Sequence, residues 1–538
     1  MVSAAPLSAI IALARAGAVD HAWRLFEAGG FSGQASDAAV ACVEGRLLKD
    51  LATRASGGER RGLCRQAAAA YERAAALQPS TYPLINAATL YRLAADTRRS
   101  AALAKRTIEL IDANPDEPET PYYSQATRAE ALLLLGRDQD ARATFAEAIA
   151  LAPSAWEDHA STLRQFALIL AAQGRDAAWL DAHRPPRSLH FGGHMSFDPK
   201  MVRREHLDEK IAAVLEEENV GFGYGALAAG ADIIIAEALL ARGAELHAAL
   251  PGGAEAFAAV SVDPFGKAWR KRFDAVLAMA ETVRPVRPIG ARPDIAMIGL
   301  ADEVAMGAAL MNGRRLESSA VQLLVLDSTT ETTNGASGRS REIWAAGGWR
   351  QRILTAPRET RHDAPAPEAK MVEPLAVLAI GFGSDASTES HFSELYAQVA
   401  RLPVPALPPY LTEDRLILAY SGPGEAAEAA VRLLGDTLPL RIGGQYGPAA
   451  TFRDPFSGAP RLAPAATAAA AAALASAPPG TAVVTDDFAA ALAAAGPHRP
   501  ASEYIGELDA PDGGPPVGLY ALKSYDQLFQ PLGGDDGQ

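Results

Sequence analysis

The 538-residue sequence predicts a multidomain protein, with an all-α region first, an α/β domain second and an α+β domain last. Three observations predict this fold class. Residues 1–184 carry apolar residues at helical spacing, residues 188–357 alternate short apolar strands with helices, and residues 373–523 begin a new sheet after a polar linker at 358–372. The chain is also too long for one hydrophobic core, since a domain averages roughly 150 residues.

Composition restricts the class of protein further. Lys and Arg total 50 against 64 Asp and Glu, and the net charge of −14 disfavours a nucleic-acid partner. Only Cys42 and Cys64 are present, so we expect no disulfide framework, and a reducing cytoplasm fits best. No uninterrupted apolar run reaches the roughly 20 residues of a membrane span, and no secretory signal is recognisable. We therefore expect a cytoplasmic protein without a membrane partner.

Residues 1–184 are predicted to form stacked helical hairpins. Small and large packing residues recur at the same spacing before a proline. The two clear copies are Ala67, Tyr71, Ala74 and Pro79, and Ala141, Phe145, Ala148 and Pro153, while a weaker copy ends at Pro115. The region resembles a divergent array of tetratricopeptide repeats, whose period is about 34 residues. The resemblance implies a protein partner bound in a groove. An unrelated helical bundle, or a structural cap for the next domain, stays open as an alternative.

Residues 188–357 begin after Pro185 and Pro186, which break the helical pattern. Glycine-rich turns follow the first two predicted strands. In parallel sheets, ligands bind beyond the carboxyl ends of the strands, where helix N-termini attract anions. The sequence therefore predicts that a nucleotide-like small molecule binds at Gly192, Gly193, His194, Ser196, Tyr224, Gly225, Gly230 and Asp232.

The second turn matches the pattern S-G-x-A-x-G-x-D, except at its first residue, through Tyr224, Gly225, Ala228, Gly230 and Asp232. The segment resembles the SLOG superfamily of Rossmann-like domains, which implies a nucleotide or nucleotide-derived ligand. The LOG-type phosphoribohydrolases of this superfamily carry G-T and a catalytic Glu after PGG. Here the sequence PGG at 251–253 runs into AEAFAA without either feature, which disfavours phosphoribohydrolase chemistry. A nucleotide-processing hydrolase in this domain is the second alternative for function.

These residues also have structural explanations. His190 and His194 are four residues apart, but on strand and turn, so a metal pair is not expected. Asp232 could cap the following helix instead of contacting a ligand. The glycines could serve tight turns. The polar stretch 328–341 is predicted to be a flexible loop.

The last domain contains seven landmarks in order between residues 373 and 523: LAVLAIGFG, EDRLILAY, LRIGGQYGP, RDPFSGAP, PPGTAVVT, SEYIGEL and GLYALK. Together they resemble the class III adenylate and guanylate cyclase domain, in the variety that follows tetratricopeptide and SLOG-like regions in bacterial proteins. The resemblance implies a ferredoxin-like α+β fold and a site formed across a homodimer interface. Residues 524–538 are expected to form a tail.

The catalytic residues that this resemblance implies are missing. Cyclase chemistry needs two carboxylates that hold metal ions, and an Asn and an Arg on one helix. The first carboxylate position holds Ile380, whereas Asp414 remains at the second, next to Arg415. Ala468 and Ala472 occupy the positions of the Asn and Arg. We expect no catalytic residue, cofactor or metal here. Asp414 is at most a remnant of a metal site, and its structural explanation is a turn residue between two strands.

These observations predict a non-catalytic signalling or regulatory protein. Its repeats would bind a protein partner, its SLOG-like domain would sense a nucleotide, and its pseudo-cyclase domain would dimerise or regulate. The first alternative is an active class III cyclase that makes a cyclic nucleotide.

Overall fold

A computed structural model describes residues 6–33, 36–114, 120–195, 206–286, 289–327, 336–356, 374–383, 389–412, 414–435, 438–509 and 516–523. The chain divides into two compact units, and the boundary between them in the sequence falls between Pro185 and Pro186. The predicted linker at 358–372, the tail at 524–538 and Pro115 lie outside the described residues.

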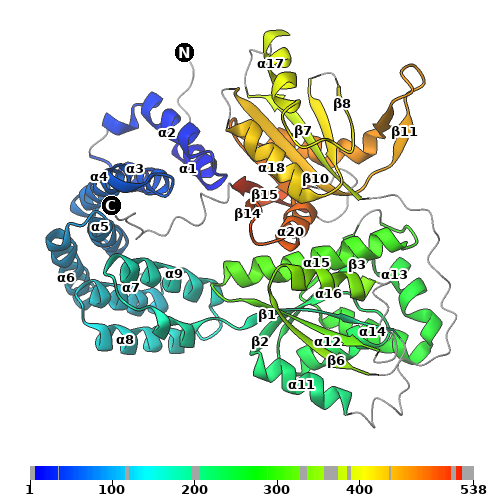
Figure 1. Cartoon of the computed structure of the whole chain (residues 1–538). Helices are drawn as coiled ribbons and strands as arrows, with labels where there is room; N and C mark the ends of the chain where they lie inside the picture. The colour runs from blue at the N-terminus through cyan, green and yellow to red at the C-terminus, as the bar shows by residue number, and fades with distance from the viewer. Residues whose placement is uncertain are drawn as a thin grey trace. The chain divides into compact units, whose positions relative to one another are not determined.

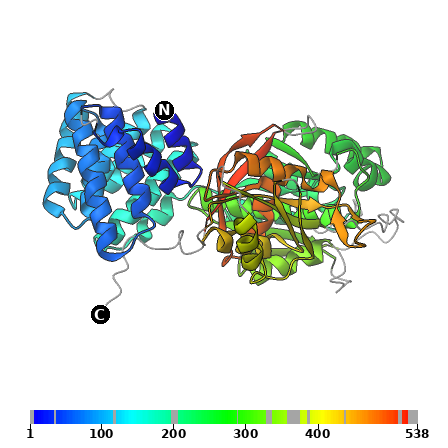
Figure 2. The same cartoon turned by 90° about the horizontal axis from the view of Figure 1, so that it is seen from above.

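The first unit is an array of antiparallel helices, drawn in blue to cyan in Figure 1 and seen side by side in Figure 2. Its elements are α1 (Leu7–Arg15), α2 (Val19–Ala28), η1 (Phe31–Gly33), α3 (Ala38–Ala52), α4 (Gly57–Leu77), α5 (Thr81–Leu93), α6 (Thr97–Ala113), α7 (Pro121–Leu134), α8 (Asp138–Leu151), α9 (Trp156–Ala172) and η2 (Ala178–His183). Successive helices pack against each other. The prediction of a helical-repeat region is confirmed.

The predicted packing residues of α4 and α8 lie inside this array. Ala67 and Tyr71 on α4, and Ala141 and Phe145 on α8, are at most 1% exposed. Tyr71 fits because α3 has no side chain at Gly45, where a Cβ would lie 2.8 Å from the tyrosine ring. Small and aromatic residues at these spacings therefore set the distance between paired helices.

The second unit begins with a six-stranded parallel sheet of order β4-β3-β2-β1-β5-β6. The strands are β1 (Arg187–Gly193), β2 (Val220–Gly225), β3 (Glu245–Pro251), β4 (Thr282–Val286), β5 (Ala320–Leu326) and β6 (Arg350–Thr355). The helices are α11 (Leu207–Glu217), α12 (Ala231–Ala241), α13 (Ala254–Ser261), α14 (Lys267–Met279), α15 (Ile295–Arg315) and α16 (Ala336–Ala346), with the short η3 (Asp263–Phe265). The strand order changes direction between β1 and β5, as in a doubly wound sheet.

Side chains of β1 alternate between two covered faces. Leu189 and Phe191 join the core formed with α11 and α12. Ser188 and His190 point to the other face and bond to Asn312 and Asp302 of α15. Both faces of the sheet are therefore packed, which agrees with its near-continuous apolar strands.

A second, seven-stranded sheet has the order β14-β15-β13-β10-β7-β9-β8. Its strands are β7 (Pro374–Phe382), β8 (Leu407–Leu411), β9 (Leu416–Tyr420), β10 (Leu440–Pro448), β13 (Ala482–Thr485), β14 (Ala501–Leu508) and β15 (Val517–Lys523), beside a hairpin of β11 (Thr451–Arg453) and β12 (Pro460–Leu462). Its helices are α17 (Glu389–Val399), α18 (Pro423–Leu434), η4 (Pro464–Thr467), α19 (Ala468–Ser476) and α20 (Asp486–Ala494). The antiparallel group β10-β7-β9-β8 has the β-α-β-β-α-β connectivity of ferredoxin-like sheets.

The two sheets share part of one core. Leu300, Ala301 and Val304 of α15 belong to the same buried cluster as the β7 residues Leu378 and Ile380. Helix α15 also packs on β1, β2 and β3, and it runs against α20. The sheets of the second unit are therefore joined by a helical layer that both of them bury.

Two helices of the second unit call for comment, and one of them corrects a prediction. Helix α15 is long and apolar enough to cross a membrane, but 61% of its most apolar window is buried inside the protein, as in a core helix. The stretch 328–341 was predicted to be a loop, whereas α16 begins at Ala336 within it. The buried Trp344 anchors this helix, because its Nε1 donates to the Arg350 carbonyl at 2.8 Å.

Candidate functional site

The two predicted glycine-rich turns lie side by side at the carboxyl ends of β1 and β2. Met195 and Gly230 form an isolated β-bridge, and the Ala231 N–H donates to the His194 carbonyl at 3.4 Å. Gly230 has a φ of 121°, a conformation that favours glycine, and it begins α12. The structure therefore places the two turns next to each other.

Gly193 and Gly225 allow protein segments to pack closely. A Cβ on Gly193 would lie 2.5 Å from both the Ala231 Cβ and the Val325 carbonyl oxygen. A Cβ on Gly225 would lie 2.7 Å from the Phe191 carbonyl oxygen. These two glycines therefore have a structural reason to lack side chains, whether or not a ligand binds.

Asp232 is buried in the first turn of α12 and 6% exposed. Its carboxylate accepts the Ala228 N–H at 3.1 Å, and it also bonds to the Gly193 backbone. Burial raises its pKa to about 8, against the opposing effect of these hydrogen bonds. Asp232 therefore ties β1 to the turn before α12, and it places an acid where an anionic ligand was expected.

Gly192 lies on the other face of β1, after Ser188 and His190. A Cβ here would meet only the Leu324 Cδ2, at an ordinary contact distance of 3.7 Å. Of the two glycines that end β1, Gly192 is therefore the one whose lack of a side chain is not explained by packing.

A buried polar network runs along the same face. The Gln322 Nε2 donates to His190 Nδ1 at 3.0 Å, so the opposite ring nitrogen, Nε2, donates to Asp302 Oδ1 at 3.0 Å. The His190 ring is fully buried and stacks on Trp344. The Asp302 side chain is 24% exposed, so it lies at the accessible edge of this network.

The remaining predicted residues are not part of this network, although Tyr224 pairs with His190 and lies on the same face of the sheet. His194 Nε2 contacts the Ala356 carbonyl at 2.8 Å, so the two histidines do not form a pair. The Tyr224 ring stacks on His247 at 4.6 Å, and its neighbours Gly223 and Gly225 face α12 and β1 instead. Tyr224 therefore lies on the face opposite Asp232. Ser196 is outside the described residues.

Sequence reasoning missed Asp302 and Gln322. The sequence did contain a signal for Asp302, because the acidic pair Asp302–Glu303 interrupts an otherwise apolar part of α15. Glu303 faces the second sheet, because it accepts the Tyr446 hydroxyl at 3.2 Å and Arg339 Nη2 at 2.5 Å. Burial raises the Glu303 pKa. Adjacent carboxylates of α15 therefore contact different sheets.

The second sheet contains Ile380 and Asp414, the two positions at which the sequence resemblance placed metal ligands. Ile380 is fully buried in β7 and pairs with Leu416 of β9. The whole strand β7 reads PLAVLAIGF and contains no acidic residue in any register. A metal carboxylate therefore cannot come from this strand.

Asp414 lies next to the carboxyl end of β7, where a Cβ on Gly381 would be 3.9 Å from its carbonyl oxygen. Its side chain is 70% exposed and accepts Arg415 Nε at 2.8 Å. The Arg415 guanidinium therefore offsets the negative charge of the Asp414 carboxylate, which a metal ion would need.

Helix α19 contains only Ala, Leu and Ser. Ala468 is exposed and Ala472 is partly exposed, so side chains at these positions would point outward. The helix lies directly on β10, because a Cβ on Gly443 would be 2.1 Å from the Ala470 carbonyl oxygen. This surface holds no functional group that could orient a ribose or stabilise a transition state. Among the described residues, no cluster of His, Cys, Asp or Glu has the geometry of a metal site.

A family model and several solved structures match separate parts of the chain. The family model described as Tetratricopeptide Repeats-Sensor matches residues 7–91, which span α1 to α5. No curated protein sequence matches the chain.

Solved structures similar to part of the chain are nucleotide cyclases. They include an adenylate cyclase from Trypanosoma brucei, 13% identical over 28% of this chain and 88% of that one, with a TM-score of 0.24. The adenylate/guanylate cyclase/hydrolase from Silicibacter pomeroyi is 14% identical over 28% and 97%, with a TM-score of 0.24. The guanylate cyclase domain of RhGC from Catenaria anguillulae is 14% identical over 29% and 99%, also with a TM-score of 0.24.

Proposed function

We propose that the protein is a non-catalytic, cytoplasmic signalling protein of bacterial type, in which a nucleotide-sensing SLOG-like domain acts on a pseudo-cyclase domain. The observation that carries this proposal is the chemistry of the second sheet. Its first metal position is aliphatic, its remaining carboxylate is paired with Arg415, and α19 has only alanines where an Asn and an Arg are needed. The fold thus persists without the groups that catalysis requires.

A cyclase assay tests the non-catalytic role. We expect no cyclic AMP or cyclic GMP from the purified protein with Mg²⁺ or Mn²⁺, because one exposed carboxylate cannot hold two metal ions. Asp414→Asn should leave the background unchanged. Metal-dependent product that this substitution abolishes would show an active cyclase instead.

We place the nucleotide at the carboxyl ends of β1 and β5, where the order of the Rossmann-like sheet changes direction. Gly192 leaves room on this face, and the exposed part of Asp302 can accept a hydrogen bond from a hydroxyl such as that of a ribose. The amides that begin α12 are a weaker candidate, because His194 and Asp232 already bond to this segment.

Gly192→Leu tests this placement. The added Cβ meets only an ordinary contact, and the rest of the side chain fills the space proposed for the ligand. We therefore expect a melting temperature close to that of the wild type and loss of nucleotide binding in a thermal-shift panel. Gly447→Leu is the matched control, since a Cβ on this strand glycine of the second sheet would meet only Leu300, at 3.9 Å. Normal nucleotide binding by Gly192→Leu would contradict the site.

Helix α15 is the proposed route from sensor to pseudo-cyclase. Asp302 contacts the network below the proposed ligand, and the next residue, Glu303, contacts Tyr446 of β10. A ligand that shifts α15 would therefore move a group in each sheet. Coupling of this kind requires a packed element shared by both sites, and α15 is one.

The hairpin β11–β12 supports a role of the pseudo-cyclase domain in homodimerisation. Its tip presents Phe456, which is 99% exposed. Asp454 holds the tip rigid by accepting Arg461 Nε at 2.7 Å and the Phe456 N–H at 2.9 Å, and the arginine lowers the Asp454 pKa to about 2. A rigid, exposed aromatic side chain is typical of a protein contact.

A further inference from the structure

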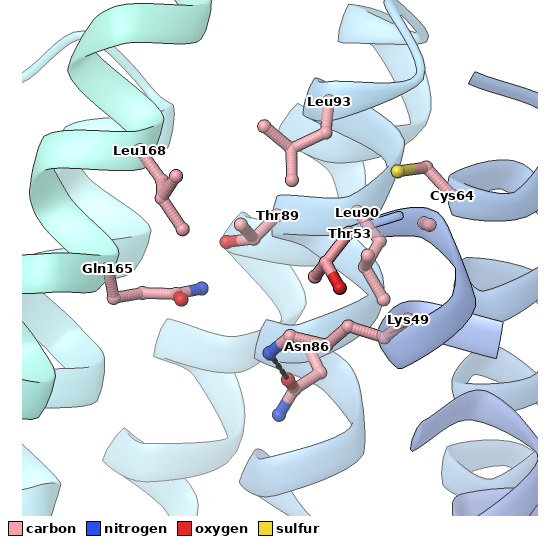
Figure 3. A pocket seen from close by; sticks show the side chains of 10 residues that line it. Lys49, Thr53, Cys64, Asn86, Thr89, Leu90, Leu93, Gln165 and Leu168 are labelled. Carbon is pink, nitrogen blue, oxygen red and sulfur yellow. Dashed lines mark hydrogen bonds between the residues drawn. The ribbon is translucent and has the colours of Figure 1, made fainter. Parts of the chain in front are cut away.

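The first unit contains a pocket of about 70 Å³ between α3, α4, α5 and α9 (Figure 3). The Lys, Asn, Thr and Gln side chains that line it all bond to the protein. Lys49 Nζ donates to the Asn86 Oδ1 at 3.2 Å, for example, and Gln165 Nε2 donates to the Glu130 Oε1 at 3.0 Å. This pocket is therefore explained without a ligand, in contrast to the surroundings of Gly192 in the second unit.

Helix α15 runs antiparallel to β1 across one face of the first sheet. Near its carboxyl end, Asn312 Nδ2 donates to the Ser188 Oγ at 3.0 Å. Earlier in the helix, Asp302 accepts His190 Nε2 at 3.0 Å, although His190 follows Ser188 in the strand. Gly299 precedes Asp302 by one helical turn on the same side of α15. It therefore lies toward the carboxyl end of β1, where the proposed nucleotide site is.

Gly299 has no packing reason to lack a side chain. It is inside α15, where glycine is less stable than alanine because it loses more backbone freedom on folding. A Cβ at this position would meet only Arg339 Nη1, at 3.9 Å. Gly192 is similar, since its Cβ would have a single contact at 3.7 Å. Two glycines that packing does not explain therefore lie at the same end of the sheet, on the face that carries Asp302.

Arg339 of α16 places a cation beside Gly299. Its side chain is 63% exposed, and its Nη2 donates to the Glu303 Oε1 at 2.5 Å. Among the residues that the structure describes, Glu303 is the one ion-pair partner of Arg339. A guanidinium group carries several N–H donors, and Nη1 is the atom that lies beside Gly299. The arginine can therefore bond to a second anion on that side.

We propose that Arg339 binds the phosphate of the nucleotide, and that the ligand is a ribonucleoside 5′-phosphate whose ribose hydroxyls donate to Asp302. This inference rests on the proposed function, which places a nucleotide at this end of the sheet. The 5′-phosphate and the 2′- and 3′-hydroxyls lie on opposite sides of a ribose, and Arg339 Nη1 lies one helical turn along α15 from Asp302. A guanidinium group also matches the geometry of phosphate oxygens. The missing side chains of Gly192 and Gly299 leave space for the sugar.

Isothermal titration of the full chain with AMP and GMP, and with adenosine and guanosine, tests the phosphate contact. We expect the wild type to bind a nucleotide about tenfold or more tightly than its nucleoside, because charge-assisted hydrogen bonds to the phosphate are lost with it. Arg339→Met should bind the two equally. Arg341→Met, at another exposed arginine of α16, is the control and should keep the wild-type preference. The wild-type preference in Arg339→Met would overturn the assignment.

Glu303→Gln separates a ligand contact from a structural role of Arg339. If Arg339 only held Glu303 in place, both Arg339→Met and Glu303→Gln would remove the same ion pair and weaken nucleotide binding equally. Because Glu303→Gln leaves the guanidinium free for the phosphate, we expect this variant to bind the nucleotide at least as tightly as the wild type. Equal losses of affinity in the two variants contradict the proposal.

Gly299→Val tests the space beside Arg339. We expect the affinity for the nucleotide to fall by about tenfold with a melting temperature close to that of the wild type, since the added Cβ has one ordinary contact. Binding that Gly192→Leu abolishes but Arg339→Met and Gly299→Val retain would overturn this inference and leave the sensor in place. If the wild type binds neither AMP nor GMP, this inference fails, whereas the sensor fails only if the whole nucleotide panel is negative.

Discussion

At the residue scale, the adjacent glycines Gly192 and Gly193 at the end of β1 have different surroundings, which the sequence could not distinguish. Gly193 is required because β1 contacts Ala231 and Val325 closely, whereas Gly192 has room for a side chain. Both positions read as turn glycines in the sequence. The difference arises because successive residues of a strand point to opposite faces, and only one face of β1 is crowded at this end.

Asp232 supports a prediction about pH. The unfolded carboxyl group loses its proton near pH 4, but the folded one keeps it until about pH 8, because burial raises its pKa. Between these values the folded state binds more protons than the unfolded state. The free energy of unfolding should therefore decrease as pH rises through this window, by at most about 1.4 kcal/mol per pH unit from this group.

Asp232→Asn removes this titration and keeps an oxygen that can accept the Ala228 N–H. We expect the variant to gain stability relative to the wild type between pH 5 and pH 8, as measured by urea unfolding at each pH. Asp414→Asn, at an exposed carboxylate, should show no such trend. A constant difference between Asp232→Asn and the wild type would mean that Asp232 is ionised in the folded protein across this range.

At the element scale, strands and helices with strong apolar patterns were predictable. The sequence runs that predicted β1, β2, β3 and α12 correspond to these elements, because strand alternation and helical periodicity are local properties. Helix α16 was not predicted, since its first turn is polar and rich in Ser, Gly and Arg. Its stability comes from Trp344, which is buried against the sheet through contacts distant in sequence.

Helix α19 shows what local sequence does determine. A run of alanines has the highest helix propensity, and its small side chains allow contact with Gly443 of β10. The same alanines exclude catalytic groups at Ala468 and Ala472. The sequence was therefore sufficient to predict the helix.

At the scale of the whole molecule, the two sheets of the second unit are coupled through α15 and α20. A Cβ on Gly307 of α15 would lie 1.7 Å from the Ala490 carbonyl oxygen of α20. Arg284, in β4 of the first sheet, bonds to Asp487 at 2.5 Å and to Asp486 at 2.6 Å. These contacts join elements that the sequence assigned to separate domains.

Gly307→Val should weaken this coupling. Overpacking costs about 1–3 kcal/mol, so we expect a lower melting temperature and separate unfolding transitions for the two sheets in calorimetry. Gly299→Val is the control on the same helix, where the nearest atom to a Cβ, Arg339 Nη1, is 3.9 Å away. Equal melting of the two variants would show that the α15–α20 contact contributes little.

The sequence by itself determined the order of the architectures, the helical repeat and the residue types at Ile380, Ala468 and Ala472. These follow from periodicity, from small-residue spacing and from the identity of single positions, all of which are local. The tertiary structure decided which glycines have space around them, and that Asp302 and Glu303 face different sheets. Each of these depends on side chains brought together from distant segments, and linear spacing contains no record of such contacts.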